Sequence, residues 1–305
     1  MLGPMPSTAP PAPDYDSPTA LRALLEAEGL AMSKRFGQNF LINRRQRERI
    51  LEELGATPGS SAWEIGPGIG SMTALALDSG LRLSAFEIDH GFARLLARLF
   101  GSNPSFSLVE GDFVDTWKPH LALSGRPSRI FGNLPYNAAN AIVASLIEGG
   151  LIPERMVFTV QKEAAQRMAA VPGTKDYSAF SVLCTSACRV RIAFDVGASS
   201  FWPAPKVTSS VVSLAPRPQP IEAGDRLGFS AFVRAGFSSR RKTLRNNLRA
   251  AGLPSGDALS EALRGVGAVQ DVRAEALSPE ELSAVFSALG RCAAIGVGLE
   301  PGAAE

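Results

Sequence analysis

From residue 62 onward the chain alternates short apolar runs with amphipathic segments, and this alternation constrains its fold more than any other feature. It predicts strands at residues 62–65, 82–88, 106–110, 129–132 and 155–161, and helices at 72–79, 92–100 and 139–148. Strands that alternate with helices pair in parallel through crossover connections, so we expect an α/β fold whose sheet is covered on both faces. Two later runs, Val190–Val196 and Ser210–Leu214, predict an antiparallel pair that closes the sheet.

Prolines and shifts in composition divide the chain into parts. Pro216, Pro218 and Pro220 form a stiff break, after which apolar periodicity predicts only helices, at residues 229–237, 240–251, 258–263 and 279–289. Two further helices, at 20–29 and 45–54, precede the sheet. We therefore expect a disordered Pro/Ala-rich leader at 1–18, an α/β domain at 19–217, a helical domain at 218–290 and a flexible tail at 291–305.

The composition excludes several classes of protein. With 45% hydrophobic and 20% charged residues, the chain is typical of soluble globular proteins. Three cysteines and two histidines are too few and too scattered for a disulfide framework or a zinc site, so we expect no metal. The longest uncharged run, Ile130–Ile147, holds three asparagines and a proline, and the N-terminus lacks the apolar core of a secretory signal. We expect a cytoplasmic monomer that does not contact a membrane.

A glycine-rich segment, Gly66-Pro67-Gly68-Ile69-Gly70, lies where a predicted strand meets a predicted helix. Glycines at such a turn let the backbone bend sharply and let a ligand approach the main chain. A dinucleotide-binding fingerprint needs a further glycine at position 71, where this chain has Ser71. Because Glu64 also stands two residues before the glycines, the pattern favours a smaller adenosine ligand without a pyrophosphate, S-adenosylmethionine.

Two acids follow the next predicted strands. Glu87 stands about 20 residues after the glycines, where a carboxylate can accept hydrogen bonds from both ribose hydroxyls. Asp112 ends the strand after that and could accept a hydrogen bond from the adenine amino group. The alternative is a tight turn with two solvated surface acids, which three suitably placed strand ends make harder to sustain.

Asn133-Leu134-Pro135-Tyr136 follows a fourth strand, so it belongs to the same edge of the sheet. The exocyclic amine of adenine is a poor nucleophile because its lone pair is delocalised into the ring. The Asn133 side-chain oxygen and the Leu134 carbonyl could both accept hydrogen bonds from that amine and draw the lone pair out of conjugation, while Pro135 restricts the turn. Tyr136 offers a stacking face for the base. By itself the segment would be equally consistent with an ordinary turn.

Basic residues cluster more than the net charge of +2 suggests. Leu30–Arg49 and Arg226–Arg249 hold thirteen of the 31 lysines and arginines and a single acid, Glu48. Such a run is usually a solvated face, but the scarcity of acids favours contact with RNA phosphates. The candidate RNA-binding residues are Lys34, Arg35, Arg240, Arg241, Lys242, Arg245 and Arg249. In the expected helix, the spacing of positions 241, 245 and 249 places three arginines on one face.

Several motifs in a fixed order carry a family resemblance over roughly residues 31–289. They are Gly37-Gln38-Asn39-Phe40-Leu41, Glu64 to Gly68, Glu87 to Asp89, Gly111-Asp112, Asn133 to Asn137, Gln161-Lys162-Glu163, Phe201 to Val207, and Arg240 to Asn246. Together they resemble the ribosomal RNA adenine dimethyltransferases, in particular the bacterial small-subunit family.

The resemblance implies a Rossmann-like class I S-adenosylmethionine-dependent methyltransferase sheet with a small C-terminal helical domain. It implies N6,N6-dimethylation of two adjacent adenosines in the 3′-terminal hairpin loop of small-subunit (16S) rRNA, on a precursor 30S particle, as part of small-subunit maturation. Carried over by position, Asn39, Leu41, Gly66, Glu87, Asp112 and Asn133 would bind the methyl donor. Asn133, Leu134, Tyr136 and Phe201 would form the catalytic site, with Tyr136 and Phe201 on the two sides of the target base.

Three other functions stay open from the sequence. A related enzyme could methylate large-subunit rRNA and confer macrolide resistance, but residues 240–246 and 201–207 argue against it. A ribosome-assembly factor could keep this fold without turnover, which the intact Asn133, Tyr136 and Glu87 disfavour. A nicotinamide dehydrogenase is disfavoured by Ser71 and by the lack of a suitably placed histidine.

Overall fold

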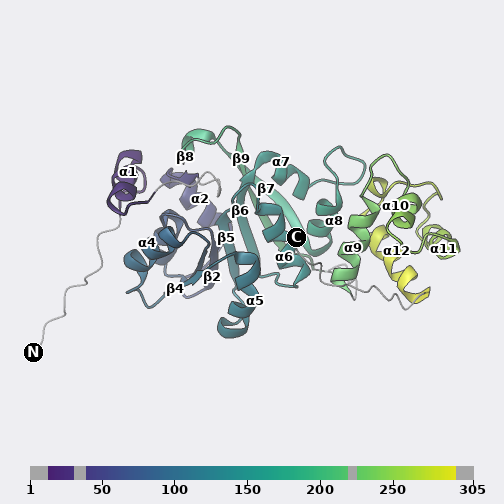
Figure 1. The fold of residues 1–305 in the computed structure, drawn as a ribbon, viewed down its shortest axis with the longest axis horizontal. Coiled ribbons are helices and arrows are strands. Elements are labelled where there is room, and N and C mark those ends of the chain that lie inside the picture. Colours follow the sequence, from purple (N-terminus) through teal and green to yellow (C-terminus); the bar gives the residue numbers. More distant parts are fainter. Residues whose placement is uncertain (1–12, 31–38, 219–224, 293–305) are drawn as a thin grey trace, which may run out of the picture. The chain divides into compact units, whose positions relative to one another are not determined.

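The computed structural model describes residues 13–30, 39–218 and 225–292 (Figure 1). Contacts divide the chain into two compact units, one formed by residues 1–169 and 187–218 and the other by residues 170–186 and 219–305. The first unit contains the sheet, and the second is helical. The expected division at residue 217 is therefore incomplete, because residues 170–186 also belong to the helical unit. Tyr177 explains this: its ring is buried in the helical core and its hydroxyl donates to the Leu277 carbonyl at 2.9 Å.

The strands within the described residues are β1 (Phe40–Leu41), β2 (Ser61–Ile65), β3 (Arg82–Glu87), β4 (Phe106–Glu110), β5 (Arg129–Asn133), β6 (Arg155–Gln161), β7 (Cys188–Val196), β8 (Phe201–Trp202) and β9 (Ser209–Pro216). Seven of these form one sheet in the order β4-β3-β2-β5-β6-β9-β7. The pairs among β2 to β6 are parallel, whereas β9 runs antiparallel to both β6 and β7. The predicted parallel sheet with a closing antiparallel pair is thus confirmed. A separate two-stranded sheet, β1 with β8, was not predicted.

Helices cover both faces of the sheet. The helices of the first unit are α1 (Pro18–Ala27), α2 (Arg44–Leu54), α3 (Ser71–Asp78), α4 (His90–Phe100), α5 (Phe113–Ser124), α6 (Ala139–Glu148) and α7 (Lys162–Met168). Successive strand residues point to opposite faces. Ala62 of β2 packs in one apolar cluster with residues of α2 and α3, whereas the neighbouring Trp63 and Phe86 contact residues of α5 on the other face.

Helix α5 shows why the sequence pattern missed an element. Pro119 lies in its interior, where proline removes a main-chain hydrogen bond and normally ends a helix. Burial compensates, because the Trp117 side chain is only 1% exposed and packs against Gly149 at the end of α6. Asp112 caps the first turn by accepting a hydrogen bond from the Val114 amide at 2.9 Å.

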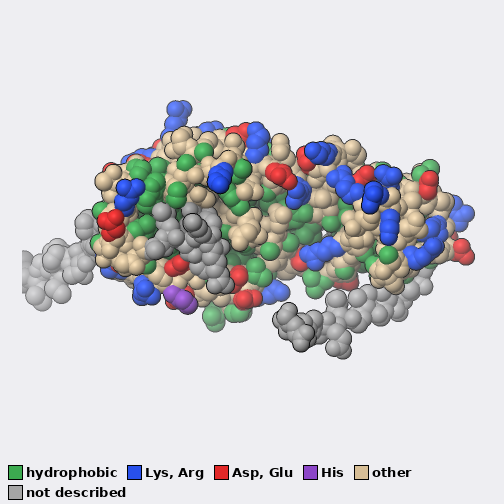
Figure 2. Space-filling model, turned by 45° about the horizontal axis from the view of Figure 1, so that its top comes forward, with side chains coloured by type: hydrophobic (Ala, Val, Ile, Leu, Met, Phe, Trp, Pro, Cys, Tyr) green, Lys and Arg blue, Asp and Glu red, His purple; other side chains and the backbone are tan. Residues whose placement is uncertain are grey.

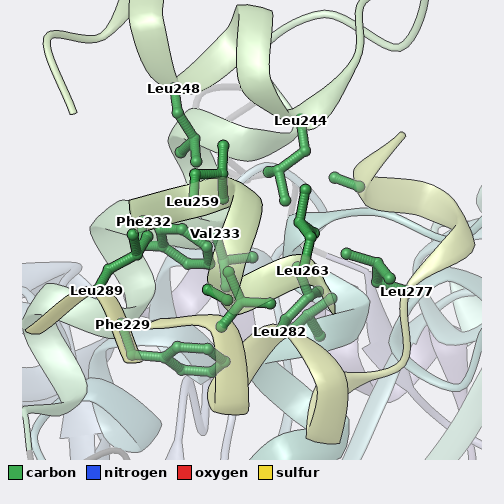
Figure 3. Packing of buried hydrophobic residues seen from close by; sticks show 14 of the residues in the cluster. Phe229, Phe232, Val233, Leu244, Leu248, Leu259, Leu263, Leu277, Leu282 and Leu289 are labelled. Atoms are coloured by element: carbon green, nitrogen blue, oxygen red, sulfur yellow. The ribbon is translucent and has the colours of Figure 1, made fainter. Parts of the chain in front are cut away.

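The helical unit has its own apolar core. Its helices are α8 (Ala179–Ala187), α9 (Arg226–Gly236), α10 (Leu244–Ala250), α11 (Asp257–Gly265) and α12 (Pro279–Cys292). Side chains from α9, α10, α11 and α12 point toward one another in this core (Figure 3). The expected helix at 240–251 begins later, at Leu244, because the Thr243 side chain caps it by accepting from the Asn246 amide. Arg241 therefore precedes the helix, and the prediction of three arginines on one helix face is wrong.

The ends of the chain differ from the expectation in their described parts. Tyr15, expected in a disordered leader, is 8% exposed and packs with Leu21 and Phe92, while Asp16 pairs with Arg47. Helix α12 continues to Cys292, two residues into the expected tail. Residues 1–12 and 293–305 lie outside the described residues. In the part of the chain that the structure describes, no helix is long and apolar enough to cross a membrane.

Candidate functional site

Polar residues collect where four neighbouring parallel strands end. Gly66 follows β2, Glu87 ends β3, Asp112 follows β4 after one residue, and Asn133 ends β5. In open α/β sheets, ligands bind at this carboxyl edge. Two cavities lie there, and they share Gly66, Ile88 and Pro135 in their walls, so they adjoin.

The larger cavity, of about 240 Å³, has mostly apolar walls. Its lining residues are Ile65, Gly66, Phe86, Ile88, Gly111, Asp112, Phe113, Pro135, Asn137, Ala138 and Ile142. Asp112 and Asn137 are the residues with polar side chains in this wall. One Asp112 carboxylate oxygen caps α5, which fixes the orientation of that side chain. A flat apolar ring system with a polar edge fits such a cavity.

The smaller cavity, of about 70 Å³, brings together most of the predicted site. Its lining residues are Asn39, Phe40, Gly66, Gly68, Glu87, Ile88, Asn133, Leu134, Pro135 and Tyr136. Six of them were singled out from the sequence, although they come from four separate segments of the chain. The parallel order of β2, β3 and β5 places three of those segments at one edge, and Asn39 precedes β1, which belongs to the separate two-stranded sheet.

Glu87 is buried at 4% exposure, and its carboxylate is held by the main chain. Its two oxygens accept hydrogen bonds from the Gly68 and Asp89 amides, both at 2.9 Å. Burial raises the pKa of Glu87 to about 7, although the two amide bonds oppose that shift. The side chain is therefore oriented before any ligand arrives, and its charge depends on pH near neutrality.

The glycine loop lies against the segment that contains β1. Gly68 has φ = +56°, and a Cβ there would lie 2.9 Å from the Phe40 ring, so both the conformation and the contact require glycine. Ser71, in the position where a dinucleotide fingerprint has glycine, donates from its hydroxyl to the Leu41 carbonyl at 3.2 Å. Phe40 and Leu41 are thereby fixed across the loop.

Asn133 is held by the same segment. Its side-chain nitrogen donates to the Asn39 carbonyl at 2.7 Å. Because this contact uses the donor end of the amide, the side-chain oxygen is left as the acceptor end. The Asn39 carbonyl can only accept a hydrogen bond, so the amide must turn its nitrogen toward it. An acceptor oxygen is what recognition of an amine requires.

Leu134 and Tyr136, which follow Asn133 in the turn, are each fixed by a hydrogen bond to another strand. The Leu134 amide donates to the Thr159 carbonyl of β6 at 3.0 Å, and the Leu134 side chain is buried at 1% exposure. The Tyr136 hydroxyl makes a hydrogen bond of 2.8 Å with the Ser209 hydroxyl of β9. Burial raises the pKa of Tyr136, so its hydroxyl stays protonated at neutral pH.

Two predicted site residues lie elsewhere. Leu41 and Phe201 are 2% and 3% exposed, pair with each other between β1 and β8, and belong to the apolar core beneath α2. Neither lines either of the two cavities described above. The binding of the methyl donor expected of Leu41 and the base stacking expected of Phe201 stay predictions, and both side chains are buried in this structure.

Glu64, the acid that precedes the glycines, also lies outside both cavities. Its carboxylate accepts a hydrogen bond from the Thr73 hydroxyl of α3 at 2.6 Å. Burial, chiefly, raises the pKa of Glu64 to about 8, with a smaller effect from the charge of Glu87. Because Glu64 and Thr73 flank the glycine loop, this contact joins the two ends of the loop.

Comparison with known proteins adds an independent observation. The family described as "Ribosomal RNA adenine dimethylase" matches residues 29–289. This chain belongs to that family. The "Ribosomal RNA small subunit methyltransferase A" of Treponema denticola is 45% identical over 270 residues, covering 87% of this chain and 92% of the relative. The protein of the same name from Pseudomonas aeruginosa is 42% identical over 217 residues, covering 71% of this chain and 81% of the relative.

The fold of this rRNA adenine dimethylase also matches a solved structure. A crystal structure of a dimethyladenosine transferase from Plasmodium falciparum aligns with a TM-score of 0.67 at 21% identity, covering 81% of this chain and 97% of the other. The predicted class I methyltransferase sheet with C-terminal helices is thus confirmed.

The candidate RNA-binding residues of the helical unit divide into two groups, and those of the first group make hydrogen bonds inside the unit. Arg240 donates to Glu275 at 2.9 Å and to the Lys175 carbonyl at 2.5 Å, so it ties parts of the helical unit together. Arg245 is more extensively engaged, with bonds to the Ser255 carbonyl (2.9 Å), the Ser260 hydroxyl (2.7 Å) and the Gln270 side chain (2.7 Å).

The other basic residues of this segment are exposed, namely Arg241, Lys242 and Arg249. Figure 2 shows Lys and Arg side chains gathered on the visible face of the helical unit. Lys34 and Arg35 lie outside the described residues. In the described segments, no group of three or more His, Cys, Asp and Glu residues is arranged to hold a metal ion.

Sequence reasoning missed the apolar half of the site. Ile88 and Phe113 each follow a predicted acid directly and line the larger cavity, together with Pro135 and Ile142. Ile88 is 40% exposed and directly follows β3. An apolar residue immediately after each strand-end acid was the signal that could have identified Ile88 and Phe113.

Proposed function

We propose that this chain transfers methyl groups from S-adenosylmethionine to the N6 atoms of two adjacent adenosines in the 3′-terminal hairpin loop of small-subunit rRNA, forming N6,N6-dimethyladenosine. The observation that carries the proposal is Asn133, whose donor end is bonded to the Asn39 carbonyl, in the wall of a cavity that adjoins a larger apolar one. The family match and the names of the Treponema denticola and Pseudomonas aeruginosa relatives support the same reaction.

The residues at the strand edge fit the methyl donor. The apolar walls and the Asp112 carboxylate of the larger cavity suit an adenine ring with its amino group. In the order of the strand ends, Glu87 lies between Asp112 and Asn133. It suits a ribose, because an ionised carboxylate accepts hydrogen bonds from hydroxyls. When bound, S-adenosylmethionine supplies an electrophilic methyl group on a sulfonium centre.

Asn133 and Leu134 would hold the target amine. In the first transfer the Asn133 side-chain oxygen and the Leu134 carbonyl would each accept one N6 hydrogen, and in the second transfer one of them would accept the hydrogen that remains. These hydrogen bonds draw the nitrogen lone pair out of the ring and toward the methyl group. Fixing both acceptors before binding lowers the barrier mainly through positioning. The methylated amine is more acidic and loses its proton to water, so a strong general base is not needed.

Tyr136 would stack on the target base once the base has left its loop. Base flipping costs a few kcal/mol, least for an unpaired base, and stacking on an aromatic ring returns about 1–3 kcal/mol per base. Tyr136 is half-buried in the cavity wall, so it can offer one face of its ring.

The partner is small-subunit rRNA in a precursor 30S particle, bound by a monomer of this chain. Exposed Arg241, Lys242 and Arg249 are proposed to contact RNA phosphates. Lys34 and Arg35, from the first basic stretch, are proposed to act in the same way. Arg240 and Arg245 would support this surface through their contacts inside the helical unit.

The test is transfer of tritiated methyl groups to undermethylated small subunits, followed by nucleoside analysis. We expect N6,N6-dimethyladenosine in small-subunit rRNA. Label in large subunits alone would contradict the proposal in favour of a large-subunit enzyme. Binding to small subunits without any transfer would contradict it in favour of a non-catalytic assembly factor.

A further inference from the structure

We propose that Ser209 is a positioning residue for methyl transfer, which holds the Tyr136 ring in place for the target base. This inference rests on the proposed function and extends it to a residue of β9 that lies 73 positions away in the sequence. Ser209 would touch neither the methyl donor nor the base, because it lines neither cavity.

The contact that carries the inference is the 2.8 Å hydrogen bond between the Tyr136 and Ser209 hydroxyls. Ser209 is fully buried at 0% exposure, and its strand residue is paired on both sides, with Gln161 of β6 and Val196 of β7. The main chain that carries this hydroxyl is fixed on both sides, because it cannot shift without breaking ladder hydrogen bonds. It is therefore a rigid anchor for a ring that stands on a turn.

Either hydroxyl can be the donor in this bond. The Tyr136 hydroxyl stays protonated at neutral pH, so it can donate to the Ser209 oxygen. With its ring anchored at the hydroxyl and its backbone following the rigid Pro135, Tyr136 keeps few alternative orientations. Asn133 is fixed in the same way by the Asn39 carbonyl. Both groups proposed to meet the target base are thus oriented by hydrogen bonds before the base arrives.

An anchored ring binds a base more tightly than a free one, because its side-chain entropy is already lost. Immobilising one side chain on binding costs about 0.5–1.5 kcal/mol, which corresponds to roughly threefold to tenfold in affinity. Loss of the anchor should therefore weaken use of the RNA substrate by that factor. It should leave binding of the methyl donor unchanged, because the donor is bound by other residues.

The chain offers a matched control in the next residue. Ser210 is also 0% exposed and lies in β9, but its hydroxyl donates to Asp195 at 2.6 Å instead of to Tyr136. Ser210→Ala therefore removes a buried hydroxyl from the same strand without affecting the ring. It reports what the loss of such a hydroxyl costs the fold alone.

The experiment compares Ser209→Ala, Ser209→Thr, Tyr136→Phe, Ser210→Ala and the double variant Ser209→Ala/Tyr136→Phe in the full chain. Each is measured for kcat/KM with undermethylated small subunits, for the Kd of S-adenosylmethionine, and for its melting temperature. We expect Ser209→Ala and Tyr136→Phe each to lower kcat/KM about threefold to tenfold, with no further loss in the double variant. Ser209→Thr keeps a hydroxyl and should therefore keep the kcat/KM of the unmodified chain. Ser210→Ala should keep it too.

Two outcomes would overturn the inference. One is equal losses of kcat/KM in Ser209→Ala and Ser210→Ala, which would mean a merely structural role. The other is a double variant whose loss is the product of the single losses, which would mean that the two hydroxyls act independently. If Ser209→Ala does not fold, Tyr136→Phe removes the same bond from the other side and keeps the test. Failure of the proposed function is distinguished by the unmodified chain, which would then transfer no methyl groups to small subunits.

Discussion

Polar side chains have opposite roles in the two units of the molecule. At the strand edge of the first unit, Glu87 and Asn133 are held by main-chain groups of neighbouring segments and line a cavity. In the helical unit Arg245 does the holding, since its guanidinium joins three separate positions between residues 255 and 270. A polar side chain that the main chain fixes in place is oriented before a ligand binds. A polar side chain that joins separate segments stabilises the fold instead.

This difference predicts which property each variant loses. Substitutions at the strand edge should reduce binding or methyl transfer while the chain stays folded. Substitutions at Arg245 should reduce stability, and any loss of RNA binding should follow from that.

Asn133→Ala should reduce methyl transfer to small subunits about 100-fold or more, the effect of removing one aligned polar group from a reaction centre. Its melting temperature should stay close to that of the unmodified chain. The measurement is single-turnover methyl transfer at saturating donor, and the matched control is Asn140→Ala, an exposed asparagine on α6. Equal activity of the Asn133→Ala and Asn140→Ala variants would contradict the mechanism.

Arg245→Met should lower the free energy of unfolding by about 2 kcal/mol, roughly a 30-fold change in the folded-to-unfolded ratio, because several hydrogen bonds of a charged group are lost. Denaturant titration measures this, with Arg249→Met as the exposed control. If the stability of the two variants is the same, Arg245 does not support the helical unit.

Donor binding should depend on pH through Glu87. Its carboxylate must be ionised to accept hydrogen bonds from ribose hydroxyls, and its pKa of about 7 means that protonation competes with binding below neutrality. The Kd of S-adenosylmethionine should therefore weaken about fivefold from pH 7 to pH 6 and about tenfold from pH 6 to pH 5, and level off above pH 8. Calorimetric titration measures it, and Glu87→Gln should bind weakly but without this pH dependence.

Stability without the donor should have the opposite dependence on pH. The pKa values of Glu87 and Glu64, about 7 and about 8, lie above those of an unfolded chain, so the folded chain favours the protonated carboxyls. Their contribution to stability is complete at low pH, falls as pH rises above the unfolded pKa of about 4.3, and levels off above pH 7 for Glu87 and pH 8 for Glu64. Glu64→Gln should make the melting temperature less dependent on pH between 5 and 8. An unchanged pH dependence would show that Glu64 does not titrate there.

Arg241→Ala and Lys242→Ala should have the smallest effects. Each should weaken small-subunit RNA binding a few-fold and reduce the slope of log affinity against log salt by about one, because each removes one phosphate contact. The donor Kd and the melting temperature should not change. Filter binding at several salt concentrations measures the slope, and an unchanged slope would remove these residues from the RNA surface.

The strand edge could be predicted because short sequence runs determine it. Glu87, Asp112 and Asn133 stand at the ends of strands that are recognisable from their apolar runs, and parallel pairing then brings them to one edge. Contacts between distant segments could not be predicted in this way. The Tyr136–Ser209 bond and the pairing that buries Phe201 against Leu41 depend on the tertiary path of the chain.

The same limit applies in the helical unit. Arg245 reads as a surface charge because its partners, Ser260 and Gln270, are themselves ordinary surface residue types. Residues 170–186 read as part of the α/β domain because they follow α7 directly, and only the buried packing of Tyr177 assigns them to the helices. Pro119 concealed α5, since burial of Trp117 compensates for a residue that local preference excludes.

The central claim is that the two adjoining cavities hold the donor and the target amine, with Asn133 in the wall of the smaller cavity. A crystal structure with S-adenosylhomocysteine tests it most directly. We predict the adenine in the larger cavity with its amino group at hydrogen-bond distance from Asp112, and the sulfur on the side of Asn133 with room for a nucleobase between Asn133 and Tyr136. An adenine bound elsewhere, or a sulfur turned away from Asn133, would contradict the account.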